Sequence, residues 1–391
     1  MRGVHFSHPD GADVLLSYCT NVHPAQDVAG VVAQLDRYAA PIRRRLGWPR
    51  LGLGLWLPAS AAAVLAADPV ALAAFGRELS SRDLFVVTVN GFPYGDFHGE
   101  RVKKLVYRPD WSDPRRLAYT LDLARILAAL LPGDVTEGTI STLPLGWRDG
   151  WTEEHHAAAL GHLSDLAREL RHLRRQTGRN IRVGLEPEPG CVIETCDDLA
   201  RAALPAEIGD HVGLCLDTCH LAVGFSDTGH FLNAAAEAGL SVVKVQAACA
   251  LQADRPADGP AREALRSLAE PRYLHQVRRR RSDGGLDGVD DLPDAARSLA
   301  ADEPWRVHFH APVHRTHVGA LRTTQPELAD ALAGLFGGPH PATRHLEVET
   351  YTWDVLPGAG GEADLVAGIA GELSWTAGRL TSLGLKGETQ T

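Results

Sequence analysis

The chain has 391 residues, and 45% of them are hydrophobic, so it can bury a core as large as that of a barrel of ~250 residues with insertions. Its formal net charge of −10 leaves no basic field for a polyanion, which argues against generic nucleic-acid binding. The start MRGVHFSHPDG lacks the apolar run of a signal peptide, and no run of about 18 apolar residues predicts a membrane span. We therefore expect a cytoplasmic protein whose six cysteines are reduced.

Short apolar runs alternate along the chain with longer stretches of helical periodicity. The apolar runs predict strands over residues 14–18, 51–57, 84–90, 135–143, 181–185, 212–216, 241–245 and 348–351. Helical spacing predicts helices over residues 27–46, 61–79, 113–131 and 152–176. The third of these helices has the clearest boundaries, because Asp113 can cap it, Pro114 suits its first turn, and Pro132 with Gly133 stops it.

Strand–helix–strand alternation repeated this often predicts a parallel sheet. Eight units favour a closed (β/α)₈ TIM barrel over an open doubly wound sheet, and no GxGxxG follows the first strand. We interpret residues 1–391 as a single barrel domain, with residues 252–343 as an elaborated segment between the seventh and eighth strands. Another strand-like run at 306–310 makes nine strand candidates for eight places.

Polar side chains follow four of the apolar runs, at the point where each predicted strand ends. Glu186 follows the fifth run, Asp217 the sixth, Gln246 the seventh, and Glu349 lies in the last. A barrel brings these strand ends together around one axis, where carboxylates repel one another unless a cation neutralises them. Oxygen ligands with one imidazole suit one Mn, Zn, Fe or Mg ion. The alternative is that each carboxylate caps a helix or pairs with an arginine.

Loops after the first and third strands carry further polar residues at the same mouth. The second of these loops is punctuated by glycine and proline and can fold over a polar ligand, and its lysine can bind a phosphate or carboxylate. A surface loop with incidental charges is the alternative. The candidate substrate-binding residues of the two loops are Asn21, His23, Asn90, Tyr94, His98 and Lys103.

Three segments resemble the metal-ligand segments of the xylose-isomerase-like superfamily, which includes the ketose 3-epimerases and endonuclease IV. These segments are VGLEPEPG, LCLDTCHLAVG and EVETYTW. The resemblance implies that Glu186, Asp217 and Glu349 are metal ligands. It also implies that His220 is either a metal ligand, as in the nucleases, or a substrate contact, as in the epimerases.

One position departs from the superfamily pattern. Members place a histidine at the end of the seventh strand, where this chain has Gln246. A histidine of the segment VHFHAPVH, either His308 or His310, would replace it. We keep Gln246 and His310 as candidate metal ligands, and His308, Glu188 and Tyr351 as candidate substrate contacts.

The chain further resembles a narrower family, the metabolite traffic protein EboE family. The segments that carry this resemblance are SYCTNVHP, VNGFPYGDFHGERVKKLVYRPDW, STLPLGW and HFHAPVH, together with the three segments above. Members of this family look like sugar-phosphate isomerases or epimerases. Their name refers to metabolite handling and defines no reaction.

The leading hypothesis is a metal-dependent isomerase or epimerase acting on a sugar, a sugar phosphate or a cyclitol-like metabolite. Glu186 and Glu349 would remove and return a proton on opposite faces of the substrate, and His220 would orient a hydroxyl group. Lys244 would stabilise an enediolate oxygen or bind an anionic group.

Two other classes of function stay open at this point. A multi-zinc phosphoester hydrolase of the endonuclease IV type would use some of the same residues, although GLGLWLPAS ends the second strand without the histidine that it needs. A non-catalytic metabolite carrier would inherit the barrel without the chemistry. The expected partner is a small polar metabolite, with or without a phosphate, and a homodimer is left open.

Overall fold

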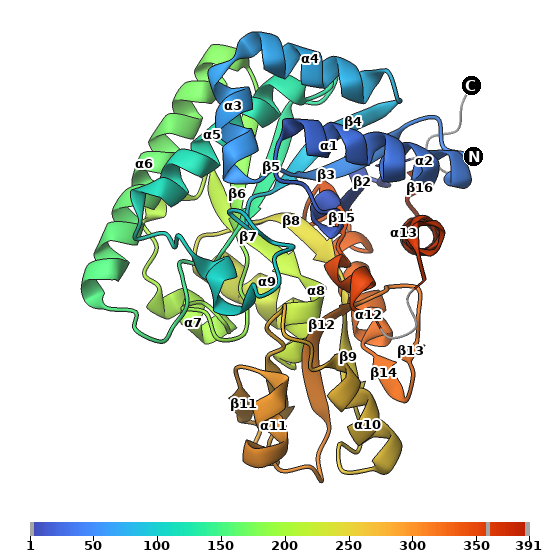
Figure 1. Ribbon diagram of the computed structural model, residues 1–391. Coiled ribbons are helices and arrows are strands. Elements are labelled where there is room, and N and C mark those ends of the chain that lie inside the picture. The colour runs from blue at the N-terminus through green and yellow to red at the C-terminus, as the bar shows by residue number, and fades with distance from the viewer. Residues whose placement is uncertain (1–3, 357–359, 388–391) are drawn as a thin grey trace.

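The computed structural model describes residues 4–356 and 360–387, and within them a closed barrel of eight parallel strands forms the centre (Figure 1). Strand β15 pairs in parallel with both β8 and β2, which closes the barrel and confirms the predicted fold class. The barrel strands are β2 (Asp13–Cys19), β3 (Leu51–Trp56), β4 (Leu84–Asn90), β5 (Glu137–Thr142), β6 (Asn180–Leu185), β7 (Val212–Asp217), β8 (Val242–Ala247) and β15 (His345–Val348).

The last barrel strand lies earlier in the chain than its apolar pattern predicts. We expected it at 348–351, but β15 ends at Val348, and Tyr351 begins a 3-10 helix, Tyr351–Asp354. The chain turns at Thr350, whose hydroxyl donates to the buried Glu372 carboxylate at 2.6 Å. The hydrogen bond of the Thr350 side chain therefore ends the strand, although the β-branched residues after Val348 favour an extended chain.

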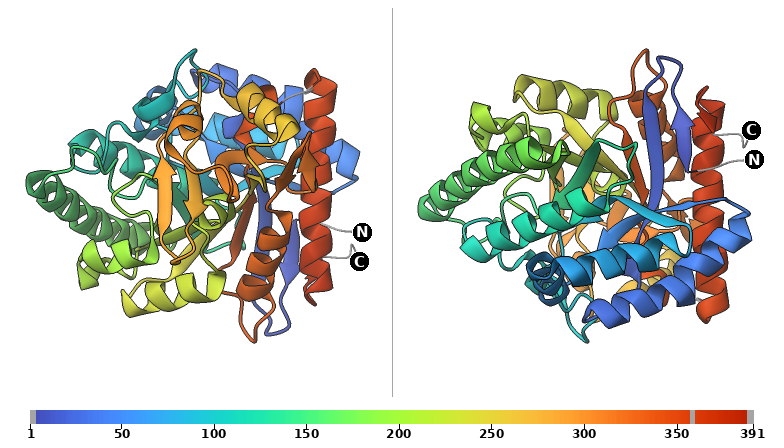
Figure 2. Two further views of the ribbon diagram at one scale, coloured as in Figure 1. Left: turned by 90° about the horizontal axis from the view of Figure 1, so that it is seen from below. Right: turned by 90° about the horizontal axis from the view of Figure 1, so that it is seen from above.

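Helices surround the barrel, and several of them begin at a capping carboxylate or hydroxyl. Asp113 accepts a hydrogen bond from the Arg115 amide at the start of α5, and Thr152 accepts one from the His155 amide at the start of α6. In Figure 2 the long C-terminal helix α13 runs along the side of the barrel. The helices around the barrel are α1 (Val28–Gln34), α2 (Ala40–Leu46), α3 (Ala59–Ala67), α4 (Pro69–Ser80), α5 (Pro114–Leu130), α6 (Glu153–Thr177), α7 (Cys196–Arg201), α8 (Thr218–Val223), α9 (Thr228–Glu237), α12 (Gln325–Phe336) and α13 (Glu362–Ser382).

The predicted helix over 61–79 is two helices, because Asp68 and Pro69 interrupt it. The Asp68 carboxylate accepts hydrogen bonds from the amides of Val70 and Ala71 and thereby starts α4 in a new direction. Among the described residues, no single helix has the length and apolar character needed to cross a membrane. Only the pair α3 and α4, bent by 112° between its halves, meets that test of length and composition.

A second sheet, which protrudes from the barrel in Figure 1, is built between β8 and β15. It has six antiparallel strands in the order β11-β10-β12-β9-β14-β13. The strand-like run at 306–310 belongs here, as part of β12, so the ninth candidate is not a barrel strand. The elements of this region are β9 (Cys249–Ala253), α10 (Gly259–Leu268), β10 (Val277–Arg280), β11 (Leu286–Val289), α11 (Leu292–Ser298), β12 (Trp305–Ala311), β13 (His317–Val318) and β14 (Leu321–Thr323).

Two short strands, β1 (His5–Ser7) and β16 (Lys386–Gly387), extend the barrel sheet beside β2 in antiparallel pairing. The single-domain interpretation and the bounds 252–343 stay predictions.

Candidate metal centre

Three carboxylates meet at the C-terminal ends of neighbouring barrel strands. Glu186 follows β6, Asp217 ends β7 and Glu349 follows β15. All three are buried, and one oxygen atom of each lies within 4.8 Å of one oxygen of the other two. The structure therefore brings together the residues that the sequence singled out at strand ends.

This arrangement is electrostatically unfavourable without a counter-charge. Burial raises the pKa of Glu186 well above its ordinary value, and the charges of Glu349 and Asp217 raise it further. Burial also raises the pKa of Glu349, followed by the charges of Asp217 and Glu347. Three carboxylates this close in a dry site ionise together only when a cation sits among them.

Three atoms of this cluster that could bind a metal ion have no hydrogen-bond partner within residues 4–356 and 360–387. They are Glu186 Oε2, Asp217 Oδ2 and His310 Nε2, and all three are buried. The other Asp217 oxygen, Oδ1, accepts from the amides of Cys219 and His220 and caps α8, so the orphaned Oδ2 has a fixed direction. Buried polar atoms normally form hydrogen bonds, so the lack of partners for these three atoms needs an explanation.

His310 is oriented as a metal ligand would be. Its Nδ1 lies 2.8 Å from the backbone oxygen of Glu349, which only accepts hydrogen bonds, so Nδ1 carries the proton. The lone pair is then on Nε2, 3.9 Å from Asp217 Oδ2. Burial lowers the pKa of His310 to about 4, which keeps the ring neutral. The residues present therefore fit a divalent cation held by Glu186, Asp217, Glu349 and His310.

Amide groups hold the carboxylate of Glu349 from both sides. Asn21 and Asn90 each donate an amide N–H to Oε1, at 2.6 Å and 2.7 Å, and Gln246 donates to Oε2. The same Gln246 nitrogen lies 3.3 Å from Glu186 Oε1, while its oxygen faces the Cys215 thiol. Gln246 thus presents its donor to the carboxylates, and its predicted role as a ligand stays a prediction.

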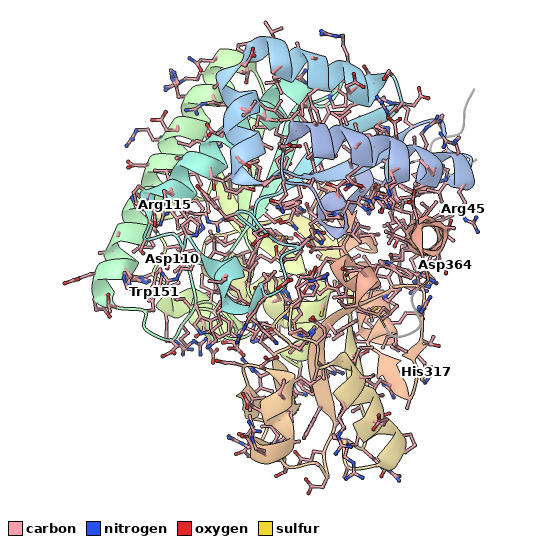
Figure 3. All side chains as sticks on the ribbon, viewed as in Figure 1. Arg45, Asp110, Arg115, Trp151, His317 and Asp364 are labelled. Atoms are coloured by element: carbon pink, nitrogen blue, oxygen red, sulfur yellow. The ribbon has the colours of Figure 1, made fainter. Side chains whose placement is uncertain are left out.

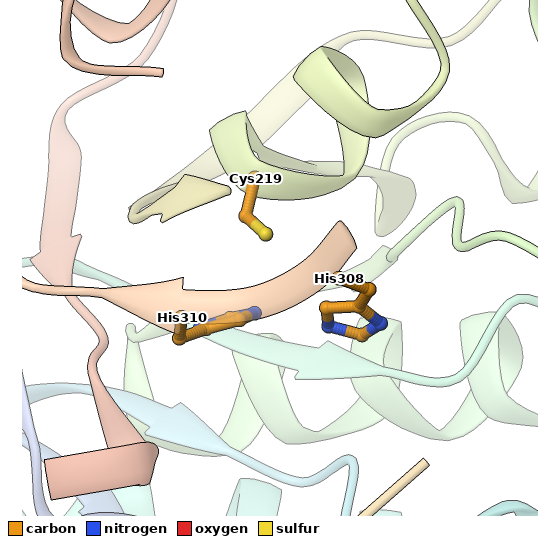
Figure 4. A group of neighbouring side chains, drawn as sticks. All are labelled: Cys219, His308 and His310. Carbon is orange, nitrogen blue, oxygen red and sulfur yellow. The ribbon is translucent and has the colours of Figure 1, made fainter. Parts of the chain in front are cut away.

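The second sheet supplies two histidines of the site, and helix α8 supplies the third, His220. Strand β12 places His308 and His310 on one face at the barrel mouth, near Cys219 of α8 (Figure 4). Nε2 of His308 lies 3.1 Å from Nε2 of His220 and 3.5 Å from the Tyr351 hydroxyl. These side chains reach the carboxylates although β12 belongs to a different sheet.

A cavity of about 50 Å³ lies over these groups. Its roof comes from the loop after β4 and from Tyr273 and Leu274 of the second sheet's region. The predicted residues that line it are Asn21, Asn90, Lys103, Glu186, Glu188, His220, His308, His310, Glu349 and Tyr351.

Six predicted site residues do not line this cavity. Asp217 and Gln246 belong to the carboxylate cluster described above, and the other four lie elsewhere. His23 stacks on Tyr38 with ring centroids 4.1 Å apart, and burial lowers its pKa to about 3. Nε2 of His98 contacts the backbone oxygen of Asn21 at 2.7 Å, so it positions that loop. Tyr94 packs on the Tyr119 ring, and Lys244 lies deeper in the barrel. The predicted roles of these four in binding or catalysis stay predictions.

Sequence reasoning missed Gln276 and Tyr107. The buried Gln276 side chain donates to Glu188 Oε1 at 3.1 Å and accepts from His308 Nδ1 at 2.7 Å. The Tyr107 hydroxyl donates to Glu188 Oε1 at 2.6 Å. Gln276 lies in no quoted motif and at no barrel strand end, and nothing in the segment VNGFPYGDFHGERVKKLVYRPDW distinguishes Tyr107 from its neighbours, so only the three-dimensional structure reveals their contacts with Glu188.

No protein-family model and no curated protein matches the sequence. Solved structures do match. A D-psicose 3-epimerase determined in the presence of D-fructose is 13% identical, with a TM-score of 0.50, over 93% of this chain and 99% of that chain. D-psicose 3-epimerase from Clostridium cellulolyticum H10 with D-tagatose gives 12% and 0.49 over 93% and 99%, and an L-ribulose 3-epimerase gives 13% and 0.48 over 94% and 95%.

At these identities the likeness defines the fold, which is a xylose-isomerase-like TIM barrel with an added antiparallel sheet. The structural neighbours include sugar epimerases, and this chain carries a buried cluster of His, Glu and Asp residues suited to a metal. The narrower resemblance to the EboE family stays a prediction.

Proposed function

We propose that this protein is a divalent-metal-dependent isomerase or epimerase that acts on a small polyhydroxylated carbonyl compound by proton transfer. The observation that carries the proposal is the pair of buried glutamates, Glu186 and Glu349, which face one cavity and share a cluster with Asp217. The substrate class comprises sugars, sugar phosphates and cyclitol-like metabolites.

The cation would be held by Glu186, Asp217, Glu349 and His310. When bound, it supplies Lewis acidity toward adjacent carbonyl and hydroxyl oxygens, which acidifies the C–H between them. Imidazole and carboxylate donors together suit Mn, Zn or Fe better than a ligand set of oxygen alone does.

Glu186 is the better placed of the two glutamates to remove the proton. Its Oε2 is buried and accepts no hydrogen bond from the described residues, so the lone pair that does not bind the cation is available to a substrate C–H. Glu349 accepts two amide donors on Oε1, which fixes its orientation for returning a proton from the other side.

The experiment is a hydrogen-exchange screen in D₂O. The protein, loaded with Mn²⁺, is incubated with a panel of ketoses, aldoses and their phosphates, and NMR follows deuterium entering the carbon next to the carbonyl. We expect exchange and a new epimer or isomer for at least one compound, with the rate lowered by about 10² or more in Glu186→Gln and in Glu349→Gln. The matched control is Glu237→Gln, an exposed position on α9. Full exchange in both site variants would contradict the assignment.

One observation favours a second candidate, a multi-zinc phosphoester hydrolase. Three buried histidines, His220, His308 and His310, lie beside the carboxylates, and imidazole is a preferred zinc ligand. Zinc-loaded protein assayed on aryl phosphate mono- and diesters separates the two candidates, because an epimerase leaves these esters intact.

A further inference from the structure

The hydrogen bonds of the three histidines at the mouth fix where each ring carries its proton. Nδ1 of His220 lies 3.0 Å from the Pro187 backbone oxygen, and Nδ1 of His310 lies 2.8 Å from that of Glu349. Nδ1 of His308 lies 2.7 Å from Gln276 Oε1. Each partner is an oxygen that only accepts hydrogen bonds, so all three Nδ1 atoms are protonated, and in the neutral form of each ring Nε2 carries the lone pair.

The orientation of the Gln276 amide is itself fixed by its neighbours. Its nitrogen faces the backbone oxygen of Pro189 at 3.0 Å and Glu188 Oε1 at 3.1 Å, and both of these atoms are acceptors. The opposite rotamer would place two acceptors against an oxygen. The amide oxygen is therefore the atom that meets His308, and the tautomer of His308 follows.

His220 and His308 then present two lone pairs to each other. Their Nε2 atoms are 3.1 Å apart, and both side chains are buried. Two neutral nitrogens in this arrangement repel unless a proton or a metal ion lies between them. The Tyr351 hydroxyl lies 3.5 Å from Nε2 of His308, at the outer limit of a hydrogen bond, and does not relieve the contact with His220.

The separation matches two ligands of one zinc ion. Zinc–nitrogen bonds of ~2.0–2.1 Å at a tetrahedral angle place two ligating nitrogens ~3.3 Å apart. A third donor is at hand, because one oxygen of Glu188 lies within 4.8 Å of a nitrogen of each of the two rings. Hydrogen bonds from Tyr107 and Gln276 to Glu188 Oε1 hold this carboxylate in place, as outer partners do for metal ligands.

We propose that His220, His308 and Glu188 bind a second divalent cation of the kind that prefers imidazole, zinc, beside the carboxylate site. Three protein ligands leave one coordination position open, and all three residues line the same cavity as Glu186 and Glu349. The second ion would therefore contact the same substrate molecule as the first ion.

The two sites share no ligand in this assignment. His310 directs Nε2 toward Asp217 Oδ2, and so belongs with the carboxylate cluster. Donor atoms of Asp217, His220 and His310 nevertheless lie within 4.8 Å of one another, so the sites are adjacent. This inference rests on the histidine geometry and not on the proposed reaction.

The test uses Zn²⁺ alone as the probe. Untagged protein is stripped with a chelator, loaded with Zn²⁺, freed of excess metal, and its zinc content is measured together with the zinc X-ray absorption spectrum. We expect about two zinc ions per chain in the wild type and about one in His220→Gln and in His308→Gln, with fewer imidazole ligands per zinc. Glu186→Gln should keep the histidine-bound zinc and lose the other.

The control variant is His317→Gln, an exposed histidine on β13 labelled in Figure 3, which should keep the wild-type content. Thermal unfolding shows whether each variant is folded. Wild-type zinc content in both His220→Gln and His308→Gln, or a single zinc in the wild type that is lost in Glu186→Gln, would overturn the proposal.

Anomalous diffraction from zinc-loaded wild-type crystals provides a second measurement that needs no variant. A peak within bonding distance of both Nε2 atoms supports the site, and its absence at full zinc loading overturns it. Failure of the proposed function looks different, because the histidine site would then hold zinc while no exchange of substrate protons occurs.

Discussion

Lys244 and Glu347 form a fully buried ion pair inside the barrel, with Lys244 Nζ 3.0 Å from Glu347 Oε1. The pair sits beneath the carboxylate cluster, where Lys244 also donates to Ser141 Oγ at 3.2 Å. Gly54 makes room for it, because a side chain there would overlap the Glu347 carboxylate. Burial alone would lower the pKa of Lys244, but the charge of Glu347 raises it above its ordinary value, so Lys244 is charged.

Removing one partner of this pair should destabilise the protein strongly. We expect Lys244→Met to lower the free energy of unfolding by about 3–5 kcal/mol, because it leaves a carboxylate buried without a counter-charge. The double variant Lys244→Met with Glu347→Leu should recover most of that loss. Urea unfolding of the two variants measures the difference. A Lys244→Met protein of wild-type stability that has lost only activity would instead support the catalytic role predicted from the sequence.

The position of Lys244 shows how far a strand pattern can be taken. Lys244 and Gln246 are two residues apart and therefore lie on the same face of β8, as their spacing predicts, so both point into the barrel. Two residues along a strand are ~7 Å apart, however, and that distance separates the mouth from the layer below it. Periodicity predicts which face a side chain occupies, but its depth depends on where the strand ends.

The position of the histidines, in contrast, could not be derived from local sequence patterns. Seven of the eight barrel strands, and the ends carrying Glu186 and Asp217, followed from local apolar runs, whereas the last strand was predicted three residues too late. His308 lies at the mouth only because β12 pairs antiparallel with β9 and β10, and Gln276 meets it across 32 positions of sequence. Pairing between distant segments of a second sheet leaves no periodic signal in a single sequence, so the residues 252–343 were predicted only as an elaborated segment.

The amide of Asn21 should govern the pH at which metal is lost. Metal binds the ionised carboxylates, so protons displace it as the pH falls. The Asn21 hydrogen bond lowers the pKa of Glu349, against the larger effects of burial and neighbouring charges that raise it. Asn21→Ala removes that hydrogen bond, and we expect the midpoint of metal release to move upward by about 1 pH unit.

Metal content measured across a pH series tests this shift. Asn233→Ala, an exposed position on α9, is the matched control and should behave as the wild type does. A midpoint unchanged in Asn21→Ala would contradict the role of Asn21, and would mean that the Asn90 hydrogen bond to the same oxygen is sufficient.

Glu372 on α13 should make the protein less stable as the pH rises. Its buried carboxyl holds the segment after Glu349, accepting from Thr350, Trp353 and the Val313 amide. Burial raises its pKa from 4.5 to about 7. Between these values the folded state binds more protons than the unfolded state, so this group's contribution to stability falls with rising pH, by about 3 kcal/mol in total.

Glu372→Gln removes the titration. The difference in free energy of unfolding between wild type and variant should therefore change between pH 4.5 and pH 7 and level off above it, as followed by urea unfolding. Glu362→Gln, at an exposed ion pair on the same helix, is the control and should show no such slope. A constant difference across this range would show that Glu372 titrates normally.

The loop after β4 should open for a substrate to enter, because the cavity of about 50 Å³ holds only a few water molecules. Its closed position is held by Lys103, which pairs with Asp291 at 2.6 Å, and by the Val102 and Lys103 amides, which donate to the Arg272 backbone oxygen. Both charged groups of that pair are mostly buried, whereas the neighbouring pair of Lys104 with Asp290 is exposed.

We expect Lys103→Ala to speed amide hydrogen exchange in residues 97–107 about fivefold, since a partly buried pair contributes about 1 kcal/mol to closure. Lys104→Ala is the control and should change exchange little, because solvent screens an exposed pair. Exchange followed by mass spectrometry separates the two. Equal acceleration in both variants would mean that total charge, rather than the buried pair, holds the loop, and unchanged exchange in Lys103→Ala would mean that the backbone bonds to Arg272 are sufficient to hold the cavity closed.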